Sequence, residues 1–152
     1  MRYVTLMLIF MCAFANAHVH DDWATIHRVG LSDHDIIHVA SVMSTNRQAT
    51  LTVDCTDNMT FHEFRRYDNE HESLLYVAFD SDDRYLATDY HESFGHRTKN
   101  LDSMSVESRQ SFDTRTSITF EVQRSDSTLG IYVFSLRGFT EAHEQLMELC
   151  NQ

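Results

Sequence analysis

Short segments in which apolar and polar residues alternate constrain this chain more than any other feature. Alternation is the pattern of a strand with one buried face, because successive side chains of a strand point to opposite sides. The pattern is clearest at residues 49–55, 73–79 and 117–123. In the first of these segments, Leu51 and Val53 fall on the same side as Cys55. A chain patterned in this way is expected to fold around a sheet.

Turn-forming residues join these segments into hairpins. Two pairs are expected, residues 73–79 with 84–90 and residues 117–123 with 130–136. The sequence DSDD separates the first pair and SDST separates the second. Both are polar clusters of the kind that turns favour.

The remaining segments are less clear. Further strands are expected near residues 36–43 and 60–65, although residues 33–39 could equally form a short helix. Residues 91–111 are polar without a period, and a long loop is expected there. The predicted fold class is mainly β (α+β), an antiparallel sheet or a β-sandwich with one helix at the C-terminus.

The expected helix closes the chain. Its apolar stripe consists of Ala142, Leu146, Leu149 and Cys150. The hydroxyl of Thr140 could cap its first turn, where Glu141 and Glu144 suit the positive end of the helix dipole. Because Cys150 lies on this stripe and Cys55 on the inward side of a strand, the two can meet, and a disulfide between them would tether the helix to the sheet.

Residues 1–17 have the pattern of a signal peptide. A positive charge is followed by an apolar run at residues 4–14, which is shorter than the about 20 residues that a bilayer-spanning helix needs. The small-x-small motif ANA ends at Ala17, where cleavage is expected. An uncleaved anchor is the alternative. Cleavage would leave residues 18–152 as a single β-rich domain in the periplasm or outside the cell.

Export makes a disulfide the simplest use of the cysteines. The chain has three, and Cys12 lies in the leader, so that Cys55 and Cys150 remain. Disulfides persist in exported proteins, and a redox pair would more often be spaced C-x-x-C, which is absent. Closing a loop of this length would remove on the order of 4–5 kcal/mol of unfolded-state freedom.

The charge of the chain excludes some partners. Lys and Arg total 12 against 23 Asp and Glu, giving a formal net charge of -11. Losing Arg2 with the leader would leave 11 basic residues against 23 acidic ones, or -12. Such a surface repels phosphate backbones and anionic lipid heads. We therefore expect no nucleic-acid partner and no membrane insertion after cleavage.

Histidines suggest a metal site as an alternative. The chain has 10 of them, and cleavage after Ala17 would start the mature chain with His18, Val19 and His20. A free amine, two amides and a third-position imidazole can hold Cu(II) in a square plane. An ordinary frayed terminus is the competing interpretation of this segment. His34 and His38 have the i, i+4 spacing of metal ligands on a helix, and ordinary surface histidines are the competing interpretation there. A zinc site is not supported by any H-E-x-x-H or paired Cys/His spacing.

No catalytic set is recognisable. The sequence lacks G-x-S-x-G, and no pair among its many carboxylates is singled out. The acidic run of Asp80, Asp82 and Asp83 lacks the glycine and terminal glutamate of a calcium loop, and a solvated turn is expected. We therefore predict a protein that is not an enzyme and holds no cofactor.

Residues spread along the chain resemble a family pattern. They are Trp23, then Leu51-x-Val53-x-Cys55, then Phe79-Asp80, then Phe134-x-Leu136-x-Gly138-Phe139-x-x-Ala142-x-x-x-Leu146-x-x-x-Cys150. The arrangement resembles small bacterial periplasmic proteins that include the type VI secretion-associated VasI family. In such families an early strand cysteine pairs with the last one, which fits Cys55 and Cys150. The resemblance implies a periplasmic accessory or binding domain without catalytic residues.

Together these observations predict an exported, non-enzymatic domain that binds another periplasmic or secreted protein. The alternative function is a periplasmic copper- or zinc-binding protein that uses the terminus formed by His18 and His20.

Overall fold

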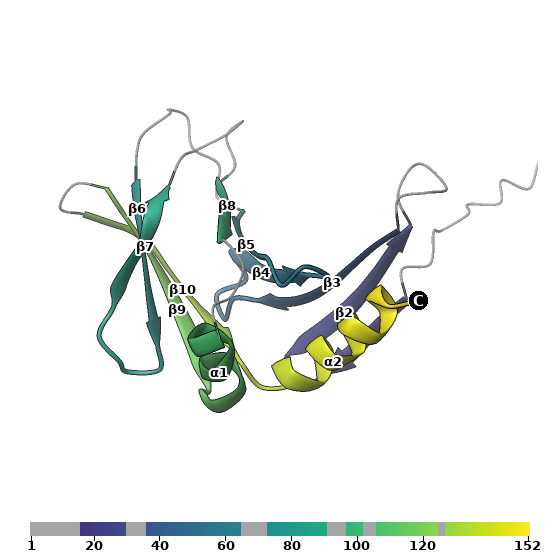
Figure 1. Cartoon of the computed structure of the whole chain (residues 1–152). Coiled ribbons are helices and arrows are strands. Elements are labelled where there is room, and N and C mark those ends of the chain that lie inside the picture. Colours follow the sequence, from purple (N-terminus) through teal and green to yellow (C-terminus); the bar gives the residue numbers. More distant parts are fainter. Residues whose placement is uncertain (1–15, 30–35, 65–72, 91–96, 102–105, 125–126) are drawn as a thin grey trace, which may run out of the picture.

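Two antiparallel sheets and two helices make up the part of the chain that can be described. The computed structural model describes residues 16–29, 36–64, 73–90, 97–101, 106–124 and 127–152. In Figure 1 one sheet stands on the left and the other extends to the right, with the C-terminal helix lying along it. This architecture is the predicted mainly β fold with a C-terminal helix.

The larger sheet, sheet A, has six strands in the order β1-β2-β3-β4-β5-β8. Their bounds are β1 Asn16–His20, β2 Trp23–Val29, β3 Ile36–Met43, β4 Ala49–Asp54, β5 Met59–Glu63 and β8 Arg97–Leu101. In β4 and β5 every second side chain is buried, as the alternating sequence predicts. We call the side that carries Leu51 and Phe61 the inner face, and the opposite side the outer face.

The smaller sheet, sheet B, has four strands in the order β10-β9-β6-β7. Their bounds are β6 Ser73–Phe79, β7 Tyr85–Tyr90, β9 Ser117–Arg124 and β10 Ser127–Ser135. Both predicted hairpins are present, since β6 pairs with β7 and β9 pairs with β10. The boundaries shift by one to three residues: the β9–β10 ladder extends into the predicted turn, whereas β7 begins one residue later than predicted.

The two sheets meet through aromatic side chains. The rings of Phe61 in β5 and Phe120 in β9 stack with their centroids 5.0 Å apart. Phe134 in β10 meets Phe61 edge to face at 6.2 Å. All three rings are fully buried. Such pairs contribute beyond the area they bury, so they fix β5 against β9 and β10 of sheet B.

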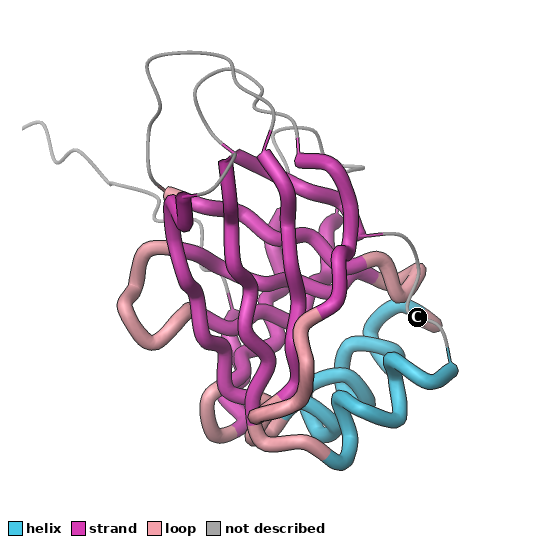
Figure 2. The backbone as a smooth tube through the Cα atoms, turned by 90° about the vertical axis from the view of Figure 1, so that its left-hand side faces the viewer, coloured by secondary structure: helices cyan, strands magenta, loops and turns pink. Residues whose placement is uncertain are grey.

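The helices cover what sheet B leaves open. Helix α2 (Phe139–Cys150) packs against β1, β2 and β3, and helix α1 (Val106–Thr114) lies beside it. Figure 2 shows both helices gathered on one side of the strands. Phe139 of α2 contacts Trp23 in β2 at 4.9 Å and Phe112 of α1 at 4.7 Å. The inner face of sheet A is therefore covered by sheet B over β4 and β5 and by α2 over β1 to β3.

The expected loop at residues 91–111 is wrong in part. Residues 97–101 form β8, which pairs with β5, and α1 begins at Val106. A polar segment can serve as an edge strand, because backbone pairing does not require apolar side chains. Helix α1 buries one large apolar side chain, Phe112, among its described residues. With so few apolar positions it leaves no periodic stripe in the sequence.

Two local expectations also change. Residues 36–43 form a strand, which settles the choice left open at residues 33–39 for the part that is described. Thr140 does not cap α2, because the helix begins one residue earlier and Gly138 occupies the cap position with φ 79°. The hydroxyl of Thr140 instead donates a hydrogen bond to Asp113 of α1 at 2.8 Å.

Among the described residues, no helix has both the length and the apolar character needed to cross a bilayer. The predicted leader at residues 1–17 falls almost entirely outside those residues, except for Asn16 and Ala17 in β1.

Candidate functional site

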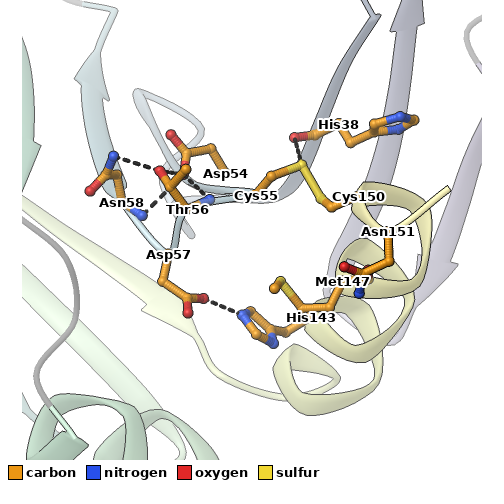
Figure 3. The surroundings of a disulfide bond; sticks show 10 residues. All are labelled: His38, Asp54, Cys55, Thr56, Asp57, Asn58, His143, Met147, Cys150 and Asn151. Atoms are coloured by element: carbon orange, nitrogen blue, oxygen red, sulfur yellow. Dashed lines mark hydrogen bonds and ion pairs between the residues drawn. A yellow bond between two sulfur atoms is a disulfide. The ribbon is translucent and has the colours of Figure 1, made fainter.

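The disulfide holds the end of α2 on sheet A. Cys55 and Cys150 are bonded with their Cα atoms 5.7 Å apart, although 95 residues separate them in the sequence. Figure 3 shows Cys55 following β4 and reaching the last turn of the helix. The Cys55 sulfur also lies 3.9 Å from the carbonyl oxygen of His38 in β3. The pair therefore fixes α2 over the centre of sheet A, as the sequence predicts.

A second clamp lies next to the disulfide. Nε2 of His143 in α2 lies 2.5 Å from a carboxylate oxygen of Asp57, which occupies the turn between β4 and β5 (Figure 3). His143 is buried, whereas the Asp57 side chain is partly exposed. His143 follows Ala142 on the apolar side of the helix, so its burial is visible in the pattern. Nothing in the sequence indicates that Asp57 would be its partner.

Asp54 organises the same turn. Its carboxylate accepts hydrogen bonds from the backbone N–H of Thr56 at 2.8 Å and of Asn58 at 3.1 Å, and from the Thr56 hydroxyl at 2.7 Å. Burial raises the pKa of Asp54, but the hydrogen bonds from Thr56 and Asn58 outweigh it and hold the pKa below its ordinary value. The turn that carries Asp57 is thereby held in shape by an ionised side chain.

The predicted metal-binding histidines lie in β1. His18 is exposed, and Nε2 of His20 lies 2.6 Å from Oε1 of Gln145 in α2. The segment pairs with β2 over its whole length, with His20 opposite Trp23. A square-planar site would have to wrap His18, Val19 and His20 around one ion, which an extended strand cannot do because successive residues point in opposite directions. Metal binding of that kind and the β1–β2 ladder therefore exclude each other.

The other predicted histidine pair is only half described, because His34 lies outside the described residues. His38 lies in β3, where the register places it opposite His27 of β2. Within the described part of the chain, no group of three or more His, Cys, Asp or Glu side chains is arranged as metal ligands would be.

In the acidic turn between β6 and β7, the side chains of Asp80 and Asp82 bind other residues of the same chain. One carboxylate oxygen of Asp80 accepts hydrogen bonds from the Thr116 hydroxyl at 2.6 Å and the Ser117 N–H at 2.8 Å. Asp82 forms an ion pair with Arg115 at 2.7 Å. The hydrogen bond from the Thr116 side chain is the largest of the effects that lower the pKa of Asp80 below its ordinary value.

The outer edge of β10 is closed by sheet A. Three alternate carbonyl groups on this edge each accept a hydrogen bond from a residue of sheet A or of the turn between β3 and β4. The pairs are Asn46 Nδ2 to Ile131 at 3.2 Å, Thr45 N to Val133 at 2.8 Å, and Trp23 Nε1 to Ser135 at 2.9 Å. These bonds join the two sheets and leave those three carbonyls unavailable to another strand.

The outer edge of β1 is open. β1 is the terminal strand of sheet A. Among the described residues, no backbone hydrogen bond reaches Asn16–His20 from the side opposite β2. In an antiparallel ladder alternate residues point their N–H and C=O away from the partner strand. The edge therefore presents backbone donors and acceptors that a further strand could use.

Exposed apolar side chains gather on the outer face of sheet A. In β3, Ala40 and Val42 are buried on the inner face, so Ile37 and Met43 point outward, and they are 52% and 51% exposed. Val19 in β1 is 71% exposed and lies opposite Ala24 on the same outer face. Val19 lies on the edge strand itself, whereas Ile37 and Met43 lie in β3, two strands from that edge and six residues apart. We call the open edge together with this outward apolar surface the candidate binding site.

Sequence reasoning expected the strand at residues 36–43 but missed β1 and β2, because it interpreted the segment at His18 and His20 as a frayed terminus; the structure corrects this by pairing β1 with β2. Alternation in a sequence shows which residues share a face, but it does not show which strand ends a sheet. No family model, no curated protein and no solved structure matches this chain. The resemblance to VasI-like periplasmic proteins therefore stays a prediction.

Proposed function

We propose that this chain is an exported, non-enzymatic domain, of the periplasm or the extracellular space, that binds another protein through the outer face of sheet A. The observation that carries the proposal is the exposure of large apolar side chains on the outer face of the sheet that ends in β1. Most large apolar side chains among the described residues are buried, and Val19, Ile37 and Met43 are three of the six that are exposed; the other three are Phe64, Leu86 and Ile131. Exposed apolar surface that is contiguous and bordered by polar residues is typical of interaction sites.

The surroundings of this face support a protein partner. Neighbouring outward residues in β4 and β5 are threonines, Thr50, Thr52 and Thr60, which are only partly exposed. These apolar and hydroxyl side chains carry no charge to desolvate, and Asp54, which lies opposite Val39 on the same face, is hydrogen-bonded within its own turn. Such a composition suits a protein surface, because interface centres are depleted of charged residues.

Lysine substitutions on the two sheets provide a matched test. Ile37→Lys would place a charge on the outer face of sheet A, and Ile131→Lys would place the same charge on sheet B. The two isoleucines are 52% and 53% exposed, so the change in the free protein is closely matched. We expect Ile37→Lys to weaken partner binding by about tenfold or more and Ile131→Lys to leave it unchanged.

The measurement is photo-crosslinking in the source cells, with a benzophenone amino acid at position 37, 43 or 131. Positions 37 and 43 should give an adduct with one defined mass, which the same protein carrying Val19→Lys loses. Position 131 should give no such adduct. Equal adducts at all three positions, or none at positions 37 and 43, would contradict the proposed face. N-terminal sequencing of the exported protein tests cleavage after Ala17 in the same preparation.

A further inference from the structure

We propose that the open edge of β1 accepts a basic, extended segment of the partner as an additional strand of sheet A. This inference rests on the proposed function and specifies the binding mode and the chemistry of the segment. Strand addition uses backbone hydrogen bonds for affinity and alternate side chains for specificity.

The backbone argument begins with the difference between strand edges. Open edges are a hazard that proteins normally cover, and β10 shows how this chain does so with donors from Asn46, Thr45 and Trp23. Nothing comparable reaches β1 from the described residues. Inward-pointing charged side chains and lysines, which commonly protect an edge, are also absent from β1, whose described side chains are His18, Val19 and His20.

The charge argument comes from the helix beside this edge. Glu141, Glu144 and Glu148 form a stripe at i, i+3 and i+7 on α2, and all three are exposed. Gln145 borders this stripe and lies within hydrogen-bonding distance of His20 in β1. Helix α2 carries no Lys or Arg at all. A strand added next to β1 would therefore have its inner side chains near carboxylates.

The two faces of the added strand would meet different surroundings. Side chains on its outer face would continue the apolar surface that begins with Val19 and Ala24. Side chains on its inner face would lie beside His18 and His20 and near the acidic stripe of α2. The segment that fits has alternating apolar and basic residues, because successive side chains of a strand point to opposite faces.

The charge disfavours a second copy of this chain as the occupant. Each copy has a formal net charge of -11, and an edge-to-edge pair would bring two acidic α2 helices to the joint. Like charges brought together at an interface oppose association. A basic segment has the complementary sign both locally and over the whole protein.

Cleavage of the leader would lengthen the unpaired backbone edge at this end of sheet A. Asn16 and Ala17 pair with His27 and Ile26 of β2. A cut after Ala17 removes both partners and leaves three residues in β1. The backbone of β2 from Ile26 onward would then also face the edge, so the incoming strand could pair with β1 and β2 in turn.

The test uses a short synthetic peptide of alternating lysine and valine, with both ends blocked. Two further copies carry N-methyl groups, one on every valine and the other on every lysine. Each methylated copy keeps the charge and composition but loses the hydrogen bonds of one edge. Fluorescence anisotropy measures the affinity of each peptide for the mature protein. We expect one methylated peptide to bind as tightly as the unmethylated peptide and the other to bind at least about tenfold more weakly.

Protein variants locate the binding. Val19→Lys should abolish binding of the lysine–valine peptide, while Ile131→Lys at the closed edge of β10 should not. Replacing Glu141, Glu144 and Glu148 by glutamine should weaken binding by about tenfold and reduce its salt dependence. Amide exchange of Val19 should slow when the peptide is bound. A matching glutamate–valine peptide should bind more weakly than the lysine–valine peptide.

Three results would overturn the inference. Equal binding of both methylated copies and the parent would show that no backbone edge is used. Tighter binding of the glutamate–valine peptide would remove the charge argument. A dimer formed through β1, detected by sedimentation and lost in Val19→Lys, would make a second copy the occupant. Crosslinking at positions 37 and 43 tests the proposed function separately, so each can fail while the other holds.

Discussion

Strands β10 and β1 each end a sheet of this molecule, but the hydrogen bonds made by their outer edges differ. At β10, three successive outward carbonyls accept hydrogen bonds from Asn46, Thr45 and Trp23. At β1, no such donor comes from the described residues. The contrast shows that described residues close the outer edge of β10 but not that of β1.

The region around β1 is stabilised from the inner face instead. Helix α2 packs there, held by the disulfide, by the contact between His143 and Asp57, and by the Thr25 hydroxyl, which donates to the Ala142 carbonyl at 3.0 Å. None of these contacts uses the backbone edge of β1. The fold can therefore keep β1 in place and still leave its outer edge accessible.

The largest effect is expected from removing the covalent tether. Cys150→Ser should lower the free energy of unfolding by about 2–5 kcal/mol, because the cross-link no longer restricts the unfolded chain. Denaturant unfolding followed by the fluorescence of Trp23 measures it. The double variant Cys55→Ser with Cys150→Ser is the control and should match the single variant. Unchanged stability in both would show that the other contacts of α2 suffice to hold it.

A substitution where the two regions meet should have the next largest effect. Gly138 connects the segment after β10 to α2 with φ 79°, and a Cβ there would overlap the His20 carbonyl at the end of β1. Gly138→Ala should lower the free energy of unfolding by about 2–4 kcal/mol, from backbone strain and overlap together. Denaturant unfolding measures the loss. Wild-type stability would show that β1 can move away from the helix start at little cost.

The closed edge itself can be weakened in two steps. Trp23→Phe removes the buried donor to the Ser135 carbonyl and should cost about 1–3 kcal/mol, because a partly buried acceptor loses its partner. Asn46→Ala removes an exposed donor to Ile131 on the same edge and should cost less than about 1 kcal/mol. Thermal unfolding followed by circular dichroism compares them. Equal losses of stability in the two variants would show that the burial of a hydrogen bond does not determine how much it stabilises this edge.

The smallest effect is expected from acid at the turn between β6 and β7. Hydrogen bonds, first from the Thr116 side chain, lower the pKa of Asp80 below its ordinary value of 3.8. A carboxyl group whose pKa is lower in the folded state than in the unfolded state stabilises the fold at pH values above its unfolded-state pKa. This stabilisation is lost as the pH falls through the folded-state pKa. Unfolding measured from about pH 5 to pH 2 should lose this contribution in the wild type but not in Asp80→Asn. Asp83→Asn, at an exposed neighbour, should keep the wild-type profile.

Alternation in the sequence was enough to predict most strands and their buried sides. Leu51 and Val53, for example, are buried on the same side of β4, because a period of two leaves only two choices of face. Prediction failed where side chains carry little of the pattern, so β1, β2 and β8 were not expected as strands. Strand β8 is polar and depends on backbone pairing with β5, and the cap of α2 depends on a close approach of Gly138 to β1.

The candidate site was predictable only in its parts. The sequence indicated that Cys55 and Cys150 would be paired and that His18 and His20 lie near a possible new terminus. It did not indicate that Asp57 would meet His143, since 86 residues separate them. Strand order was equally hidden, so β1 could not be recognised as an edge.

The sequence by itself determined the class of fold, the strands with clear alternation, the inward side of each, the two cysteines available for pairing and the negative charge. These properties depend on the chain's composition and on periods of a few residues. Tertiary structure alone decided that three carbonyls of β10 are bonded while no described residue bonds the outer edge of β1, and that α2, with its three exposed glutamates, packs against β1. These features depend on contacts between residues more than 80 positions apart, such as Thr45 with Val133 and His20 with Gln145. Local patterns carry no information about such contacts, because the same strand can pair at an edge or in the middle of a sheet.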